Sequence, residues 1–198
     1  GRKIWSRTYG GALDDSAGGM CLTSDGGFAL CGGTDSFAVG GETDAWLVKT
    51  NAYGDMQWYN TLGEKGNDYA LFVIQTPDGG YALAGITDSY GAGLLDARLV
   101  KTDASGNMQW NKTYGGAGRD VVEHMVLASG GGYALAGYTN SSGAGNNDFW
   151  LIKTDANGNM QWNKTYGGAG EDKAYSVVAT PDGGYALAGY TTSFGLYK

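Results

Sequence analysis

Residues 108–118 read MQWNKTYGGAG, and residues 160–170 repeat the same letters. The Trp in this stretch also occurs in two earlier copies, which gives the series Trp5, Trp58, Trp110 and Trp162. Successive members of the series are 53, 52 and 52 residues apart. A second stretch, YALAG, keeps the same interval at 81–85, 133–137 and 185–189. A fixed period of about 50 residues indicates a solenoid, a propeller or a similar array.

Each repeat is expected to form four short strands. In the second repeat these cover residues 68–76, 81–87, 97–102 and 108–115. The sequence PDGG at 77–80 predicts a hairpin turn between the first two, because Gly accepts a positive φ. Helical periodicity is absent. Four antiparallel strands in a repeat of about 52 residues predict the blade of a β-propeller, and therefore an all-β fold.

The whole chain, residues 1–198, is expected to be one propeller domain of four blades. The expected repeats are 1–9 plus 171–198, 10–62, 63–114 and 115–170. Gly1 aligns with Gly158, which makes residues 1–5 a fourth strand, and residues 196–198 (LYK) resemble the third strand at 151–153 (LIK). Both termini would then complete one composite blade, which leaves no free edge. Closure as a monomeric four-bladed ring, closure as an eight-bladed homodimer, and a piece of a longer protein all stay open.

Composition excludes several classes of partner. The chain has 37 Gly among 198 residues, yet 42 % of the residues are hydrophobic and 13 % aromatic, enough for a core. The 13 basic and 20 acidic residues give a net charge of −7, which argues against a nucleic-acid or anionic-membrane partner. No apolar run approaches the roughly 18 residues of a membrane span, so no membrane insertion is expected. Because an initiator Met and a signal peptide are absent, we expect a processed chain or an excised fragment.

Two stretches, KTDASGNMQW (101–110) and KTDANGNMQW (153–162), resemble the tryptophan-docking repeat of quinoprotein-like propellers. The whole repeat is similar to those of archaeal and bacterial cell-surface β-propeller proteins. This resemblance implies a Trp that stacks between blades and, together with the acidity, an extracellular or cell-surface location. Quinone-dependent enzymes of that kind use an adjacent Cys pair, whereas Cys21 and Cys31 are ten residues apart. No cofactor is therefore expected, and a disulfide between these two Cys depends on the strand register.

A carboxylate recurs where each first strand begins, after the TYGG stretch or its equivalent. Ring closure would bring these residues to the mouth of the central channel, where like charges would attract a cation such as Ca²⁺. Alternatively, each carboxylate caps its own loop by accepting backbone N–H bonds. Capping is the primary role that we expect, with Ca²⁺ as the alternative. The residues concerned are Asp15, Asp68, Asp120 and Asp172.

Aromatic residues are expected near the same end of the strands. Beside acids and Gly backbone they suit stacking on sugar rings, and the alternative is packing between blades. These candidate ligand-binding residues are Phe37, Tyr90, Phe194, Tyr114 and Tyr166. Arg98 replaces the Trp found at Trp46 and Trp150, so one interface between blades is expected to differ by a cation–π contact.

The function expected from these patterns is that of a non-catalytic extracellular binding module. One loop face would bind a glycan or a surface protein. A purely structural surface module is the second interpretation, and an enzyme with its site in the channel mouth is the third. His124 has no repeated Ser, Cys or carboxylate partner, so we do not expect it to be catalytic. Sequence motifs of hydrolases, P-loop proteins and dinucleotide-binding proteins are absent.

Overall fold

The computed structural model describes residues 4–40 and 42–194. These residues form an all-β structure in which no helix is long and apolar enough to cross a bilayer. The first two repeats contain β1 (Asp15–Leu22), β2 (Phe28–Thr34), β3 (Asp44–Thr50), β4 (Met56–Thr61), β5 (Asp68–Gln75), β6 (Tyr81–Thr87), β7 (Asp96–Thr102) and β8 (Met108–Tyr114). The rest contain β9 (Asp120–Leu127), β10 (Tyr133–Thr139), β11 (Asp148–Thr154), β12 (Met160–Tyr166), β13 (Asp172–Ala179) and β14 (Tyr185–Thr191).

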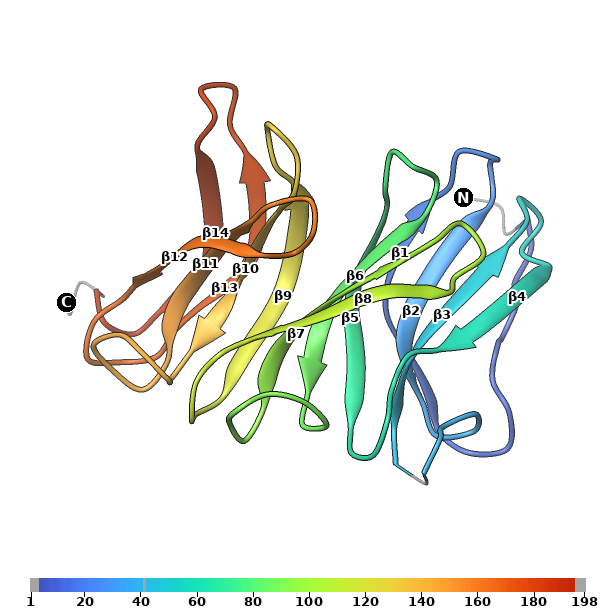
Figure 1. Cartoon of the computed structure of the whole chain (residues 1–198), viewed down its shortest axis with the longest axis horizontal. Helices are drawn as coiled ribbons and strands as arrows, with labels where there is room; N and C mark the ends of the chain where they lie inside the picture. Colours follow the sequence, from blue (N-terminus) through green and yellow to red (C-terminus); the bar gives the residue numbers. More distant parts are fainter. Residues whose placement is uncertain (1–3, 41, 195–198) are drawn as a thin grey trace. The chain divides into compact units, whose positions relative to one another are not determined.

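The strands form one sheet per repeat, with neighbouring strands in chain order (Figure 1). Three sheets have four strands, β1 to β4, β5 to β8 and β9 to β12, and the last pairs β13 with β14. The predicted all-β repeat of four antiparallel strands is thereby confirmed for the described residues. The turns form as predicted, since Gly26 and Gly79 have φ of 81° and 83°.

The chain divides into two compact units, which we treat separately. The first comprises Gly1–Leu83 and Val100–Asn111, and the second comprises Ala84–Leu99 and Lys112–Lys198. In the first unit β5 lies across β1, β2 and β3, and in the second β13 lies across β9, β10 and β11. We call each such contact of one repeat with the next a seam.

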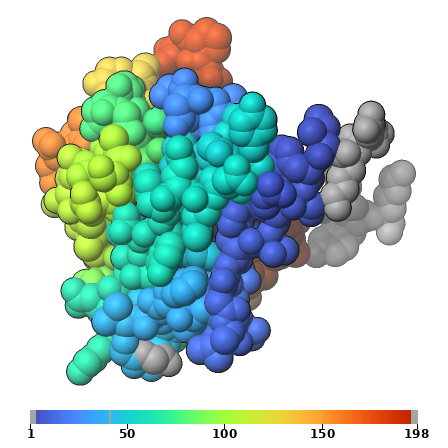
Figure 2. All heavy atoms as spheres, turned by 90° about the vertical axis from the view of Figure 1, so that its right-hand side faces the viewer, coloured from blue at the N-terminus to red at the C-terminus, as the bar shows by residue number. Residues whose placement is uncertain are grey.

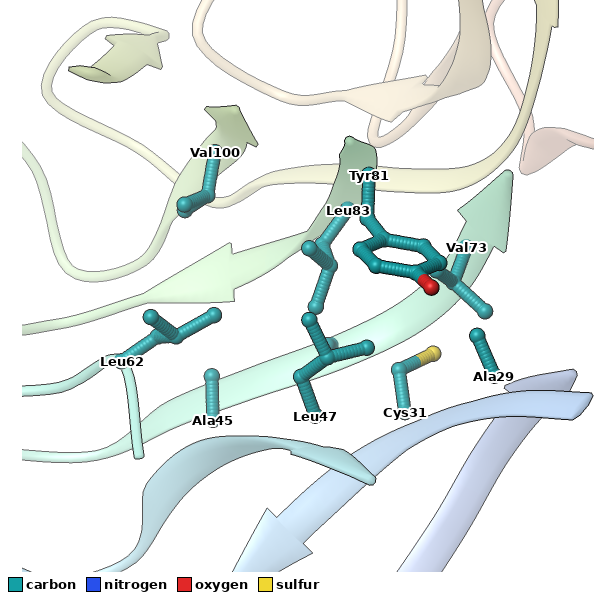
Figure 3. Close-up of a cluster of buried hydrophobic side chains, with 10 residues drawn as sticks. Ala29, Cys31, Ala45, Leu47, Leu62, Val73, Tyr81, Leu83 and Val100 are labelled. Atoms are coloured by element: carbon teal, nitrogen blue, oxygen red, sulfur yellow. The ribbon is translucent and has the colours of Figure 1, made fainter. Parts of the chain in front are cut away.

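Each seam has a small apolar core. In the first unit Leu47 and Cys31 from one repeat meet Val73, Tyr81 and Leu83 from the next, and all are at most 2 % exposed (Figure 3). In the second unit the equivalent core includes Ala134, Ala136 and Leu151 on one side and Ala174 and Val177 on the other. Alternate residues of a strand point to opposite faces, so every sheet can supply side chains to the seam on either side of it.

The Trp series packs between repeats, as predicted. The Trp58 ring lies 5.8 Å from Tyr81 in an edge-on arrangement, and Trp162 lies 6.1 Å from Tyr185. Trp5 contacts Phe28 in the same way at 5.9 Å, although residues 4–14 form no strand. Each of these three Trp rings therefore lies edge-on to the aromatic residue that begins the second strand of the following repeat.

The strand register decides the state of the two cysteines. Cys21 lies opposite Ala29, and Cys31 lies opposite Gly19, so the two Cys are not cross-strand partners. Both are free. The possible disulfide of the sequence analysis is thus not formed, and burial raises the pKa of the Cys31 thiol to about 12.

The predicted composite blade falls largely outside the part of the chain that the structure describes. Its third strand, at residues 196–198, and the start of its fourth strand, at residues 1–3, both lie outside the described residues. Closure by this blade therefore stays a prediction.

Candidate functional site

The candidate site is the set of loops at the end of the sheets where first and third strands begin, which we call the loop face. It consists of the loops between repeats, at 10–14, 63–67, 115–119 and 167–171, and the loops between second and third strands, at 35–43, 88–95 and 140–147. Residue 41 of these loops is outside the described part of the chain. Loops on a rigid scaffold are where binding residues are commonly found.

The carboxylate that begins each first strand ties together the loops next to it within its own unit. Asp120 accepts hydrogen bonds from the Gly116 N–H at 2.9 Å, from the Ser141 hydroxyl at 2.6 Å and from the Thr139 hydroxyl. It thus ties the loop between repeats to the second strand and to the loop that follows it. The same arrangement recurs at Asp15, with Gly11, Thr34 and Ser36, and at Asp172, with Gly168 and Ser193.

These hydrogen bonds favour the ionised carboxylate. Burial acts to raise the pKa of Asp15, but its bonds from Thr34, Gly11 and Ser36 outweigh burial and lower it. Burial likewise opposes a lowered pKa at Asp172, where bonds from Ser193 and others prevail. The geometry is that of the capping role.

The geometry offers no support for a shared cation. Within residues 4–40 and 42–194 no three His, Cys, Asp or Glu side chains are grouped so that they could hold a metal ion. Asp68 accepts a bond from the Glu64 N–H at 3.2 Å, again within its own loop. The prediction of Ca²⁺ at Asp15, Asp68, Asp120 and Asp172 stays a prediction.

A second row of buried carboxylates begins the third strands. Asp148 accepts the N–H groups of Ala144 at 2.9 Å and Gly145 at 3.3 Å. Asp44 accepts the Val39 N–H at 2.6 Å. Each loop between second and third strands is therefore fixed at its tip by the strand that follows it.

The two rows meet at the seams. The Asp120 N–H donates to Leu95 O at 2.7 Å, which places Asp120 beside Asp96. Gly115 lies against both, since a Cβ there would be 2.3 Å from Asp96 Oδ1 and 2.5 Å from Asp120 Oδ2. Burial raises the pKa of Asp96, and the charge of Asp120 adds to the rise. This pairing was not predicted from the sequence, although the Gly of TYGG signals it.

Three of the five predicted ligand-binding aromatics are engaged in packing contacts. Phe37 lies 5.7 Å from the Trp46 ring. Tyr90 lies beneath the Arg98 guanidinium at 5.1 Å, so the cation–π contact forms within one repeat and not at the interface between blades where it was predicted. Tyr114 is 5 % exposed, and its hydroxyl donates to Gly158 O at 2.6 Å.

The other two predicted residues are accessible. Tyr166 is 46 % exposed and Phe194 is 70 % exposed. Both lie in the second unit. They retain free ring surface of the kind that stacks on a sugar.

The structure adds a set of apolar side chains that sequence reasoning missed. Leu13, Val39 and Leu94 are exposed by 65 %, 62 % and 80 % at the tips of the loop face. Their N–H groups are held by Ser36 Oγ at 2.9 Å, Asp44 Oδ2 at 2.6 Å and Gly118 O at 3.1 Å, respectively. In the sequence, these three residues could have been recognised as apolar residues inside Gly-rich loops.

His124 contributes to packing at the seam in the second unit. Its Nδ1 accepts the N–H of Val177 at 3.4 Å, and burial lowers its pKa. This contact joins β9 to β13.

Comparisons with known proteins name no family. No family model matches the chain. The regulatory protein FlaEY of Caulobacter vibrioides is 25 % identical over 217 residues, which cover 98 % of this chain and 21 % of that protein. The chain thus spans about a fifth of the length of this curated relative. A protein of unknown function from Bacteroides caccae is similar in structure with a TM-score of 0.49 and 10 % identity, over 87 % of this chain and 52 % of that chain.

Proposed function

We propose that the four repeats are blades of a β-propeller and that this propeller is a binding module with no catalytic role. The recurring seams support this proposal, because each places the first strand of one sheet across the face of the previous sheet. In the proposed propeller, strands from both termini form the composite blade. The partner meets the loop face.

The proposal rests on the exposed apolar residues at the tips of the loop face, whose backbone is fixed by hydrogen bonds. Leu13, Val39 and Leu94 are each more than half exposed, yet their backbone N–H groups are held by hydrogen bonds. A preformed loop loses little conformational entropy when it binds, so more of the contact energy remains as affinity. Aliphatic tips of this kind suit a protein partner.

A glycan is the second candidate partner. Tyr166 and Phe194 are the predicted stacking residues that keep exposed rings. Phe37, Tyr90 and Tyr114 are engaged in packing, which leaves less aromatic surface for sugars than the sequence suggested.

The proposed setting is extracellular or at a cell surface. The net charge of −7 favours partners other than nucleic acids and anionic membranes. A structural surface module would have the same fold without a partner at the loop face. An enzyme would need a reactive group at the channel mouth.

The test uses the biotinylated chain as a probe on a panel of purified bacterial surface proteins and on a glycan array. One variant carries Leu13→Ser, Val39→Ser and Leu94→Ser together. The matched control is Tyr53→Ser, because Tyr53 is 72 % exposed in the turn between β3 and β4. A third variant carries Tyr166→Ala and Phe194→Ala.

A protein ligand whose binding falls at least tenfold in the triple variant, but not in the control, is the expected result. Glycan binding that depends on Tyr166 and Phe194 would replace the protein partner with a sugar. Binding that survives both loop variants, or no ligand on either panel, would contradict a binding role for the loop face.

A further inference from the structure

A buried lysine on the third strand of each of the first two repeats is neutralised by the turn between the first and second strands. Lys49 is 5 % exposed, and its Nζ lies 2.8 Å from Asp25 Oδ2. Lys101 is 5 % exposed, and its Nζ lies 2.8 Å from Asp78 Oδ2. A buried ammonium group is costly unless it is paired and hydrogen-bonded. The carboxylate in the turn therefore compensates for the burial of the lysine.

The turn holds this carboxylate with two further donors. Asp25 Oδ1 accepts the Thr23 hydroxyl at 2.5 Å and the Gly27 N–H at 3.0 Å. In the second repeat the corresponding donors to Asp78 Oδ1 are Thr76 and Gly80. An ammonium, a hydroxyl and a backbone N–H thus converge on one carboxylate in each of these two repeats.

The third repeat keeps the lysine but loses the carboxylate. Its turn reads ASGGG at 128–132, where the first two repeats read TSDGG and TPDGG. Gly130 therefore stands where the other two turns have Asp, and Ala128 stands where they have Thr. Lys153 is still buried, with 8 % of it exposed. Its Nζ donates only to neutral acceptors, which are Gly131 O at 3.1 Å, Thr154 O at 2.6 Å and Gln161 Oε1 at 3.2 Å.

Among residues 4–40 and 42–194, no other carboxylate forms an ion pair with Lys153 in place of the Asp. Asp155 is close in sequence, but its two oxygens accept the Asn159 N–H at 2.8 Å and the Asn159 side-chain amide at 3.0 Å. The equivalent Asp103 is held in the same way in the second repeat, where the ion pair with Asp78 forms nevertheless. Burial lowers the pKa of Lys153, and the charge of Asp155 only opposes this shift.

The glycines of the third turn leave room for a carboxylate from outside the chain. A Cβ added at Gly130 or Gly131 would have no atom within 4 Å, so this part of the turn is open. Gly132 has φ of 78°, whereas the equivalent Gly27 and Gly80 are not at positive φ. Glycine adopts positive and negative φ with similar ease, so the turn can take the conformation of the other repeats at little cost.

We propose that the turn at 128–132 and Lys153 together bind a carboxylate group from outside the chain. The carboxylate takes the position that Asp25 has in the first repeat. It accepts hydrogen bonds from Lys153 Nζ and the Gly132 N–H, and it displaces Gly131 O from the ammonium group. The ion pairs of the first two repeats supply the geometry of this bound state.

A carboxylate suits this site better than a phosphate. The single charge of Lys153 balances one carboxylate, whereas Asp155 adds negative charge nearby that would repel a dianion. The Asp25 side chain is 54 % exposed in the equivalent ion pair, so the contact is partly in water. We therefore expect a dissociation constant on the order of 10 mM for a free acid.

The site is separate from the loop face. The turns follow the ends of the first strands, whereas the loop face lies where first strands begin. Figure 2 shows the first repeat, in which the turn at 23–27 (blue) and the loop at 35–40 (light blue) are at opposite ends. All residues of the site belong to the second unit. The inference therefore does not depend on the function proposed for the loop face.

The experiment follows the backbone amide of Gly132 by nuclear magnetic resonance in the ¹⁵N-labelled full chain at pH 7. One probe is sodium acetate, raised to about 200 mM while sodium chloride keeps the ionic strength constant. The other probe is the peptide acetyl-Gly-Asp-Gly-amide, which represents an acidic side chain of a partner protein. The matched control carries Ala128→Thr and Gly130→Asp, which rebuild the turn of the other repeats and supply an internal carboxylate.

We expect a saturable shift of the Gly132 signal in the wild type, with acetate or with the peptide, and none in the control. Binding of the peptide at least tenfold tighter than acetate would assign the carboxylate to a protein partner, and otherwise it belongs to a small acid. Lys153→Met should also abolish the shift, and it replaces the control if the rebuilt turn does not fold. A shift that fails to saturate with both probes, or that persists in the folded variants, would overturn the proposal.

Discussion

Gly115→Ala tests whether the paired carboxylates fix the backbone between repeats. Gly115 has φ of 152°, and a Cβ there would lie 2.3 Å from Asp96 Oδ1 and 2.5 Å from Asp120 Oδ2. Both carboxylates are at most 2 % exposed, so neither can move into water without opening the seam. The matched control is Gly130→Ala, because Gly130 has φ of 80° and no atom within 4 Å of the added Cβ.

The magnitude follows from what each change must disturb. A non-glycine residue at positive φ costs about 1–2 kcal/mol, and this is the whole cost at Gly130. At Gly115 the methyl group must also displace Asp120 from the Gly116 N–H, now 2.9 Å away. Losing a hydrogen bond to a charged group costs about 1.5–3 kcal/mol. We therefore expect a loss of about 3–5 kcal/mol in the free energy of unfolding for Gly115→Ala, and about 1–2 kcal/mol for the control.

Urea unfolding followed by Trp fluorescence measures both variants under the same conditions. The midpoint should fall several times further for Gly115→Ala than for Gly130→Ala, with the slope unchanged. Equal losses would refute the reasoning, because they would show that the two carboxylates yield freely to an added methyl group.

Three further changes probe the same structure. The hydrogen bond from Lys101 lowers the pKa of Asp78 to about 2, below the value of 3.8 in the unfolded chain. The ionised Asp78 therefore stabilises the fold fully above pH 3.8, and this stability is lost as the pH falls toward 2. Asp78→Asn should therefore flatten the dependence of melting temperature on pH between about 5 and 2. Burial raises the folded-state pKa of Asp96, so ionising it weakens the fold as pH rises, and Asp96→Asn should melt higher than the wild type at pH 7 but not at pH 3. Trp58→Ala removes a half-buried ring from its edge-on contact with Tyr81 and should cost about 2 kcal/mol in urea unfolding, whereas a change below about 0.5 kcal/mol would remove this Trp from the seam.

The strands and turns could be predicted because each signal is local and repeated. Gly26 and Gly79 take the positive φ that their Asp-Gly-Gly turns demand, and the apolar runs on either side pair across them. The free cysteines show the limit of this reasoning. Cys21 faces Ala29, which is two residues of register away from Cys31, and the turn closed by the Thr23 N–H and Gly27 O sets that register.

The candidate site was harder to predict because the exposure of a loop side chain depends on the packing around it, including the packing against the neighbouring repeat. The carboxylates could be assigned to caps, since a short acidic side chain beside Gly backbone finds N–H donors within its own loop. The aromatics could not be assigned in this way. Phe37 and Tyr90 follow a Ser in equivalent loops, yet one packs against Trp46 and the other lies under Arg98.

Tyr114 and Tyr166 show why repeated letters alone cannot locate a binding surface. Both belong to the same stretch, MQWNKTYGGAG, yet Tyr114 is 5 % exposed and Tyr166 is 46 % exposed. Tyr114 is buried because its hydroxyl reaches Gly158 O in the turn of the next repeat, at 2.6 Å. The sequence of one repeat therefore supplies the side chains on one side of each seam, and the neighbouring repeat supplies the side chains on the other side. Under the proposed binding function, specificity would therefore come from residues that depart from the repeat and stay exposed, as Val39 and Leu94 do.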